Sequence, residues 1–245
     1  MRMKQVSSYS MGLAIHLCAK TIARRLILTV MCLTVAGALS AYFWLSEFPF
    51  PATKWFYELF SLDGELNIPA WYSAFSLLFC SALLKVISLI KTEDRHFSYW
   101  KTLYFIFLYL SLDEAFSFHE ILIIPSVRES LNLYPLFFQT WVIPGTIFVG
   151  IFAFKYLKFW FHLPYKTRYL FLIAAVVYVS GTLVMEMVGG LLREDFGRRN
   201  AITLTGIVVE EFLEMAGIVI FIYALLAYLS SLRESLQLEI HISEK

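Results

Sequence analysis

Long apolar segments separated by short polar connections occupy most of the chain. A helix needs about 20 apolar residues to cross the hydrocarbon core of a bilayer. Six segments meet this length, near residues 26–46, 70–91, 101–124, 137–158, 168–191 and 203–229. Because the connections are short, the pattern predicts an all-α fold, a single six-helix transmembrane bundle over residues 26–232. A polar segment, 1–25, precedes the bundle, and a charged tail, 233–245, follows it.

The composition is typical of an integral membrane protein. The 245 residues are 59% hydrophobic and 16% charged, whereas about 25% of a soluble domain is charged. The net charge is only +1, and no basic, aromatic-rich patch is present, which argues against a nucleic-acid partner. Cys18, Cys32 and Cys80 lack metal-binding spacing, so we interpret them as core thiols rather than as a disulfide or zinc set.

The basic residues predict the orientation of the spans. The first apolar run continues through Leu45 and exceeds the roughly 7–15 residues of a signal-peptide core, so it is predicted to be a retained span. Fourteen of the 20 basic residues then lie on the side of the termini, five lie opposite, and Lys85 lies near the inner end of the second span. The positive-inside rule therefore places both termini in the cytoplasm, in a bacterial-type inner or plasma membrane. Arg193, Arg198 and Arg199 would lie in an external loop.

Ionisable residues interrupt three of the predicted spans. They are Asp113, Glu114, His119 and Glu120 in the third, Glu186 in the fifth, and Glu210, Glu211 and Glu214 in the sixth. Such groups are costly in a membrane, usually face the bundle interior, and are functional candidates. Several carboxylates together would cost about 15 kcal/mol, comparable with the net stability of a domain. We therefore expect protons, cations or cavity water to stabilise them.

Helical geometry predicts that these groups share one site. At about 100° per residue, Asp113 and Glu120 lie only about 20° apart around a helix, with Ser117 between them. Glu114 and His119 diverge from that stripe by about 100° on either side. Thr182 lies one turn before Glu186. We expect three helices to converge, with Ser117 and Thr182 supporting the ionisable groups.

The first functional hypothesis is a divalent-metal site. Carboxylates with one imidazole suit iron, manganese or magnesium. The ligands would be Asp113, His119, Glu120, Glu186, Glu210, Glu211 and Glu214, with His119 and Glu114 as catalytic groups. The site would support oxidoreductase or hydrolase chemistry on a lipid or small molecule in the bilayer. No Glu-x-x-His is present, so any likeness to helical di-iron sites is limited to ligand type.

Two other hypotheses use the same residues. A proton- or cation-coupled transporter would place its carboxylates on the last helix of each three-span half. A non-catalytic assembly or structural subunit would use them for helix packing. Nucleotide chemistry is not indicated, since no nucleotide-binding pattern is present. The substrate and the oligomeric state stay open.

The remaining polar features have simpler interpretations. Asp63-Gly64-Glu65 predicts a turn in the first external connection, with a re-entrant cap that brings Asp63 or Glu65 to the site as the alternative. Pro144-Gly145 lies inside the fourth predicted span and predicts a kink. Four histidines in flanks or loops are interpreted as ordinary surface residues: His16, His96, His162 and His241.

Overall fold

The computed structural model describes residues 18–46, 51–130, 133 and 135–232. These ranges are mainly helical and contain no strand. The elements are α1 (Ala19–Ser46), α2 (Pro51–Phe60), α3 (Ile68–Ile90), α4 (Phe97–Phe116), the 3-10 helix η1 (Phe118–Leu122), α5 (Pro125–Ser130), the 3-10 helix η2 (Pro135–Phe137), α6 (Val142–His162), α7 (Tyr165–Val179), the π-helix η3 (Ser180–Met185), α8 (Glu186–Phe196) and α9 (Ala201–Leu232).

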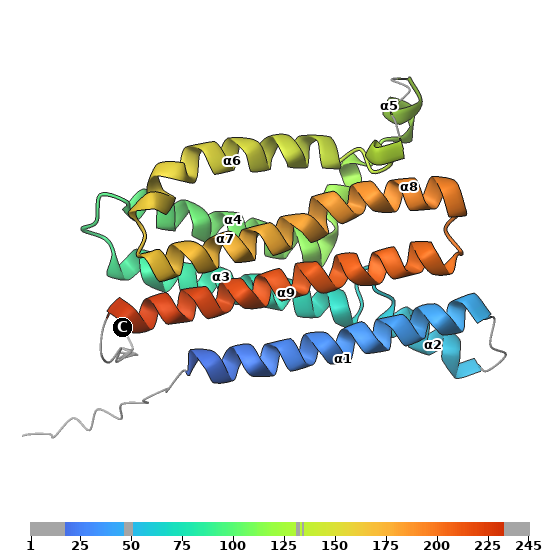
Figure 1. Ribbon diagram of the computed structural model, residues 1–245, viewed down its shortest axis with the longest axis horizontal. Coiled ribbons are helices and arrows are strands. Elements are labelled where there is room, and N and C mark those ends of the chain that lie inside the picture. The colour runs from blue at the N-terminus through green and yellow to red at the C-terminus, as the bar shows by residue number, and fades with distance from the viewer. Residues whose placement is uncertain (1–17, 47–50, 131–132, 134, 233–245) are drawn as a thin grey trace, which may run out of the picture.

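The long helices run side by side along one axis (Figure 1). α9 lies in the middle of the bundle and packs against α1, α3, α7 and α8, while α3 packs against α4. η3 joins α7 to α8, so Tyr165–Phe196 forms one long helical unit. The start of α1 and the end of α9 lie at the same end of the bundle (Figure 1).

Five helical units in the described part of the chain are long and apolar enough to cross a membrane. They are Ala19–Ser46, Ile68–Ile90, Val142–His162, Tyr165–Phe196 and Ala201–Leu232. They correspond to five of the six predicted spans, with shifted ends. α4, which corresponds to the predicted span 101–124, is not among them. It contains Lys101, Asp113 and Glu114, and it ends at Phe116.

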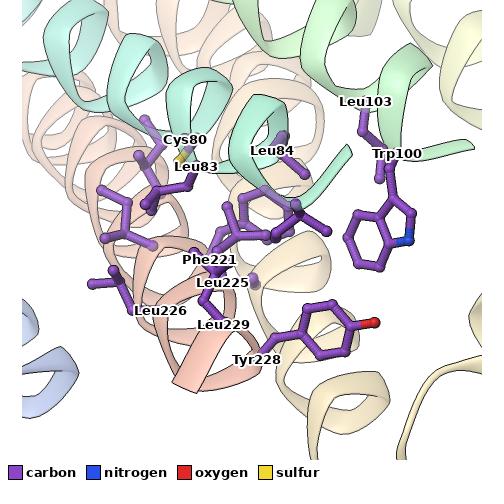
Figure 2. Packing of buried hydrophobic residues seen from close by; sticks show 14 of the residues in the cluster. Cys80, Leu83, Leu84, Trp100, Leu103, Phe221, Leu225, Leu226, Tyr228 and Leu229 are labelled. Atoms are coloured by element: carbon purple, nitrogen blue, oxygen red, sulfur yellow. The ribbon is translucent and has the colours of Figure 1, made fainter. Parts of the chain in front are cut away.

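The main core lies near the α3–α4 connection, where α3, α4 and α9 meet (Figure 2). Cys80 and Leu84 of α3 are fully buried there beside Leu225 of α9. The indole of Trp100 stacks on Tyr228, with ring centroids 5.1 Å apart. This end of the bundle is therefore tightly packed around α9. Toward the other end of α4, Ser111 donates a hydrogen bond to the Ala74 carbonyl of α3.

Several local predictions can be compared with the fold. Pro144 lies in the first turn of α6, because the helix begins at Val142 rather than near 137. The missing N–H of proline is tolerated there, so the predicted mid-helix kink is wrong. Lys85 is exposed and its ammonium lies 5.2 Å from the Tyr104 ring centroid. Most of the predicted segment 1–25, the whole tail 233–245, His16 and His241 lie outside the described residues.

Candidate functional site

The carboxylates of α9 lie where this helix meets the unit formed by α7, η3 and α8. The Glu210 residue is only 7% exposed, and Glu211 and Glu214 are partly exposed. Gly181 allows the two helices to touch, since a Cβ there would lie 2.6 Å from Glu214 Cγ and 2.9 Å from the Glu210 carbonyl oxygen. Gly181 belongs to η3, and single π-helical turns often occur at functional sites. The backbone of η3 therefore lies directly against the acidic segment of α9.

A chain of charged groups connects α9 to the end of the bundle. Glu210 lies within electrostatic range of Glu186, the first residue of α8. The Arg193 guanidinium donates to Glu186 Oε1 and to Asp63 Oδ1, each at 3.3 Å. Asp63 also accepts from Arg198 at 3.5 Å.

The position of Arg193 corrects a prediction. The sequence places this residue in an external loop after residue 191, but α8 continues to Phe196 and contains it. Its side chain is only 9% exposed. Because the helix extends by more than one turn, the guanidinium faces back toward Glu186 and provides a basic partner that the sequence pattern did not reveal.

Asp113 and His119 form a pair at the end of α4. The helix ends at Phe116, and Ser117 adopts a left-handed conformation with φ 53° and ψ 43°. The reversal lets Asp113 Oδ1 accept the His119 backbone N–H at 2.8 Å, and Oδ2 lies 3.1 Å from His119 Nδ1. The predicted continuous helix over 101–124, with Asp113 and Glu120 on one stripe, is therefore wrong. A local hydrogen-bonded turn replaces the stripe.

The remaining predicted site residues take different positions. Glu114 lies within electrostatic range of Asp113, His119 and Glu65. Glu120 is exposed and also lines the cavity described below. The Thr182 hydroxyl donates to the Tyr178 carbonyl at 3.2 Å, so this bond is directed to the backbone of its own helical unit.

These groups line one cavity of about 600 Å³ inside the bundle. All eight predicted ionisable site residues line it, and Asp63, Glu65 and Arg193 join them. Aromatic residues line the rest: Phe107, Phe148, Phe152, Tyr156, Phe159, Phe171, Tyr178 and Phe221 are among them. Along α4 the apolar lining residues precede Asp113, and along α9 most of them follow Glu214, with Ile207 before Glu210 as the exception. The cavity therefore has an acidic end and a long aromatic body.

A second cluster lies at the opposite end of α4. Asp94 and His96 belong to the α3–α4 connection, and His162 is the last residue of α6. One potential ligand atom from each lies within 4.8 Å of the other two. Among the described residues, this is where three His, Cys, Asp or Glu ligand atoms come so close together. The His96 and His162 rings stack, with centroids 4.0 Å apart.

The comparison with protein families matches residues 15–229 to a model described as a domain of unknown function, DUF8692. The chain belongs to this family. The match spans both the acidic cavity and the Asp94–His96–His162 cluster. No curated protein and no solved structure matches the chain significantly.

The sequence located the acidic cavity better than the second cluster. Asp113, Glu114, His119, Glu186 and the three α9 carboxylates stand out because they interrupt apolar segments. His96 and His162 lie in polar connections and are 66 positions apart, so spacing gives no sign that they meet. The interpretation of His96 as an ordinary surface residue is wrong, because its side chain is 12% exposed. The catalytic and metal-binding roles of the cavity residues stay predictions.

Proposed function

We propose that this protein is a membrane enzyme that acts on an amphiphile held in the cavity. The shape and lining of the cavity carry the proposal. A cavity of about 600 Å³ is within the range of small-molecule sites. Its acidic end would take a polar head group, and its aromatic body would take a hydrocarbon chain. Phe148 and Leu172 line the cavity and are exposed, which supports access from the lipid beside α6 and α7.

The charge of the lining restricts the head group. Nine acidic residues line the cavity, against one arginine and one histidine. Buried carboxylates need protons, cations or hydrogen-bond donors to stabilise them. We therefore propose that the head group is cationic or arrives with a divalent ion such as iron, manganese or magnesium. Glu186, Glu210, Glu211 and Glu214 would hold this positive charge.

The Asp113–His119 pair supports hydrolysis as the reaction class. A carboxylate that binds Nδ1 fixes the tautomer of the imidazole and leaves Nε2 as the acceptor. The same arrangement orients a general base in many hydrolases. In the proposed reaction, His119 accepts a proton from the attacking water, and Asp113 stabilises the imidazolium. Glu114 would start protonated and donate its proton to the leaving group, and the proton on His119 would restore Glu114 after the products leave.

Lipid analysis tests this proposal. Membranes that contain the wild-type protein should accumulate a product amphiphile, measured by mass spectrometry of lipid extracts. Asp113→Asn and His119→Ala should lower that product at least about 100-fold, the usual scale of general-base catalysis. Phe148→Leu, which changes the apolar lining without an ionisable group, is the control and should keep most of the activity. Equal lipid profiles in wild type and both variants would rule out the enzyme.

The charged chain favours transport as a second candidate function. Asp63, Arg193, Glu186 and Glu210 connect an exposed end of the bundle to a buried carboxyl group. Such a series can pass protons in carriers and pumps. In proteoliposomes, a carrier would move protons in the absence of lipid turnover, and Glu210→Gln would stop that movement. Lipid turnover without proton movement would reject this candidate.

We also propose that α4 crosses the membrane as a sixth span. It lies along the bundle axis with the five apolar units (Figure 1), and Trp100, Leu103 and Ser111 are buried. Six crossings would place both ends of the bundle on one side. The distribution of basic residues favours the cytoplasm for that side, in a bacterial-type inner or plasma membrane.

A further inference from the structure

The cluster of Asp94, His96 and His162 contains the ligand types of a transition-metal site. Imidazole nitrogen suits zinc, iron, copper and nickel, and two histidines with one carboxylate form a common open metal site. The ligand atoms of the three residues already lie within 4.8 Å of one another. A metal ion about 2.0–2.2 Å from each ligand atom fits such a separation after small side-chain rotations.

The buried nitrogen of His96 gives an independent sign of a ligand. His96 Nδ1 is shielded from solvent and has no hydrogen-bond partner among the described residues. It lies 3.3 Å from Asp94 Oδ1, outside hydrogen-bonding geometry. Buried polar atoms are normally satisfied, because an unpaired one costs about 1–3 kcal/mol. A metal ion at the centre of the cluster would satisfy this nitrogen.

The contacts of Asp94 position its carboxylate to bind a cation. Its Oδ1 accepts the His96 backbone N–H at 2.8 Å, and its Oδ2 lies 3.7 Å from Lys91 Nζ. This hydrogen bond fixes the carboxylate beside His96, where it offers an oxygen ligand to the cluster. The Lys91 side chain is 27% exposed, and its 3.7 Å separation from Oδ2 exceeds a normal hydrogen-bond length.

We infer that Asp94, His96 and His162 bind one divalent transition-metal ion, of which zinc is the representative, at the end of the bundle opposite the acidic end of the cavity. The site is separate from the proposed enzymatic function. It joins the last residue of α6 to the connection that begins α4. α6 is mostly exposed, with Ile147, Ile151 and Phe154 facing outward. A metal bridge at His162 would therefore fix α6 beside the cavity.

Metal binding to the full chain in detergent, purified with a tag that contains no histidine, tests this inference. Elemental analysis should find one zinc per chain after dialysis, and cobalt should give a visible absorption band. His162→Ala and His96→Ala should weaken zinc binding at least about tenfold, a change reported even for supporting residues of metal sites. His162 is exposed at a helix end, so its replacement should leave the fold intact. Zinc should also raise the melting temperature of the wild type but not of His162→Ala.

Two sets of controls separate this site from others. His16→Ala/His241→Ala removes the histidines outside the described residues and should keep full zinc binding. His119→Ala and Glu214→Gln should also keep it. Zinc binding that survives His162→Ala and His96→Ala would overturn the inference. Binding lost only in His119→Ala and Glu214→Gln would also overturn it, while assigning the metal to the cavity and supporting the metal part of the proposed function.

Discussion

Ser117 holds the turn that joins α4 to His119. Its left-handed conformation, φ 53° and ψ 43°, is costly for residues with a β-branched side chain and free for glycine. Ser117→Val should therefore destabilise the protein by about 1–2 kcal/mol, or about 2–8 °C in melting temperature for a chain of this size. Ser117→Gly should be neutral or mildly stabilising. Thermal unfolding in detergent measures both, and equal melting temperatures would contradict the role of the turn.

The hydrogen bond to Asp94 predicts a dependence of stability on pH. The His96 backbone N–H lowers the pKa of Asp94 from its usual 3.8. A depressed pKa in the folded state stabilises the protein above pH 3.8, and this contribution is lost as the pH falls through the folded-state pKa. In chelator, Asp94→Asn should lower stability at pH 7 by about 1 kcal/mol. The difference from wild type should shrink as the pH falls below 3.8 and through the folded-state pKa, as measured by thermal unfolding.

At the scale of the elements, close contact between α9 and η3 positions the acidic groups. A Cβ at Gly181 would overlap Glu214 Cγ and the α9 backbone, whereas a Cβ at Gly150 of α6 would meet nothing within 4 Å. Gly181→Ala should force the helices apart and destabilise by about 1–3 kcal/mol. Gly150→Ala is the matched control and should be neutral or stabilising by about 0.5 kcal/mol. Thermal unfolding compares the two, and similar effects would contradict tight packing at Gly181.

The helical pattern of the sequence predicts elements better than their ends. Apolar length alone located five long helices, because about 20 apolar residues in a row have few other stable arrangements. The end of α4 was missed because Phe118, Ile121 and Leu122 continue the apolar pattern past Ser117. The turn depends on hydrogen bonds from His119 to Asp113, which periodicity does not reveal. The sequence also did not predict that α8 continues past residue 191 to include Arg193. The partners of Arg193 are Asp63, in the connection between α2 and α3, and Glu186.

The acidic residues that line the cavity could be predicted from the sequence, but the contacts among them could not. A carboxylate in an apolar segment is a strong signal on its own, so the acidic residues were found individually. Pairing depends on distances across the bundle: Glu186 meets Glu210 from another helix, and Asp63 reaches Arg193 across 130 positions. For the same reason, the sequence did not predict that His96 and His162 lie side by side. Contacts between distant segments come from packing, and no local pattern encodes them.

At the scale of the whole molecule, the two candidate sites lie toward opposite ends of α4. The acidic end of the cavity lies near the end of α4, and the Asp94–His96–His162 cluster lies at its beginning. If α4 crosses the membrane, the two sites face opposite sides of it. The metal site would then lie at the end of the bundle with the α1 start and the α9 end. Topology therefore determines which compartment supplies each site.

Cysteine labelling in intact cells tests this topology. Six crossings place Cys18 and Ser231 on one side and Glu194 on the other, because α1 starts and α9 ends at the same end of the bundle (Figure 1). Cys18, Ser231 and Glu194 are exposed. In a Cys32→Ala/Cys80→Ala background, an impermeant maleimide should label Glu194→Cys from outside the cell when Cys18 is also replaced by alanine. It should label Cys18 and Ser231→Cys only after lysis. Labelling of Cys18 and Ser231→Cys from opposite sides would mean an odd number of crossings, and α4 would not span the membrane.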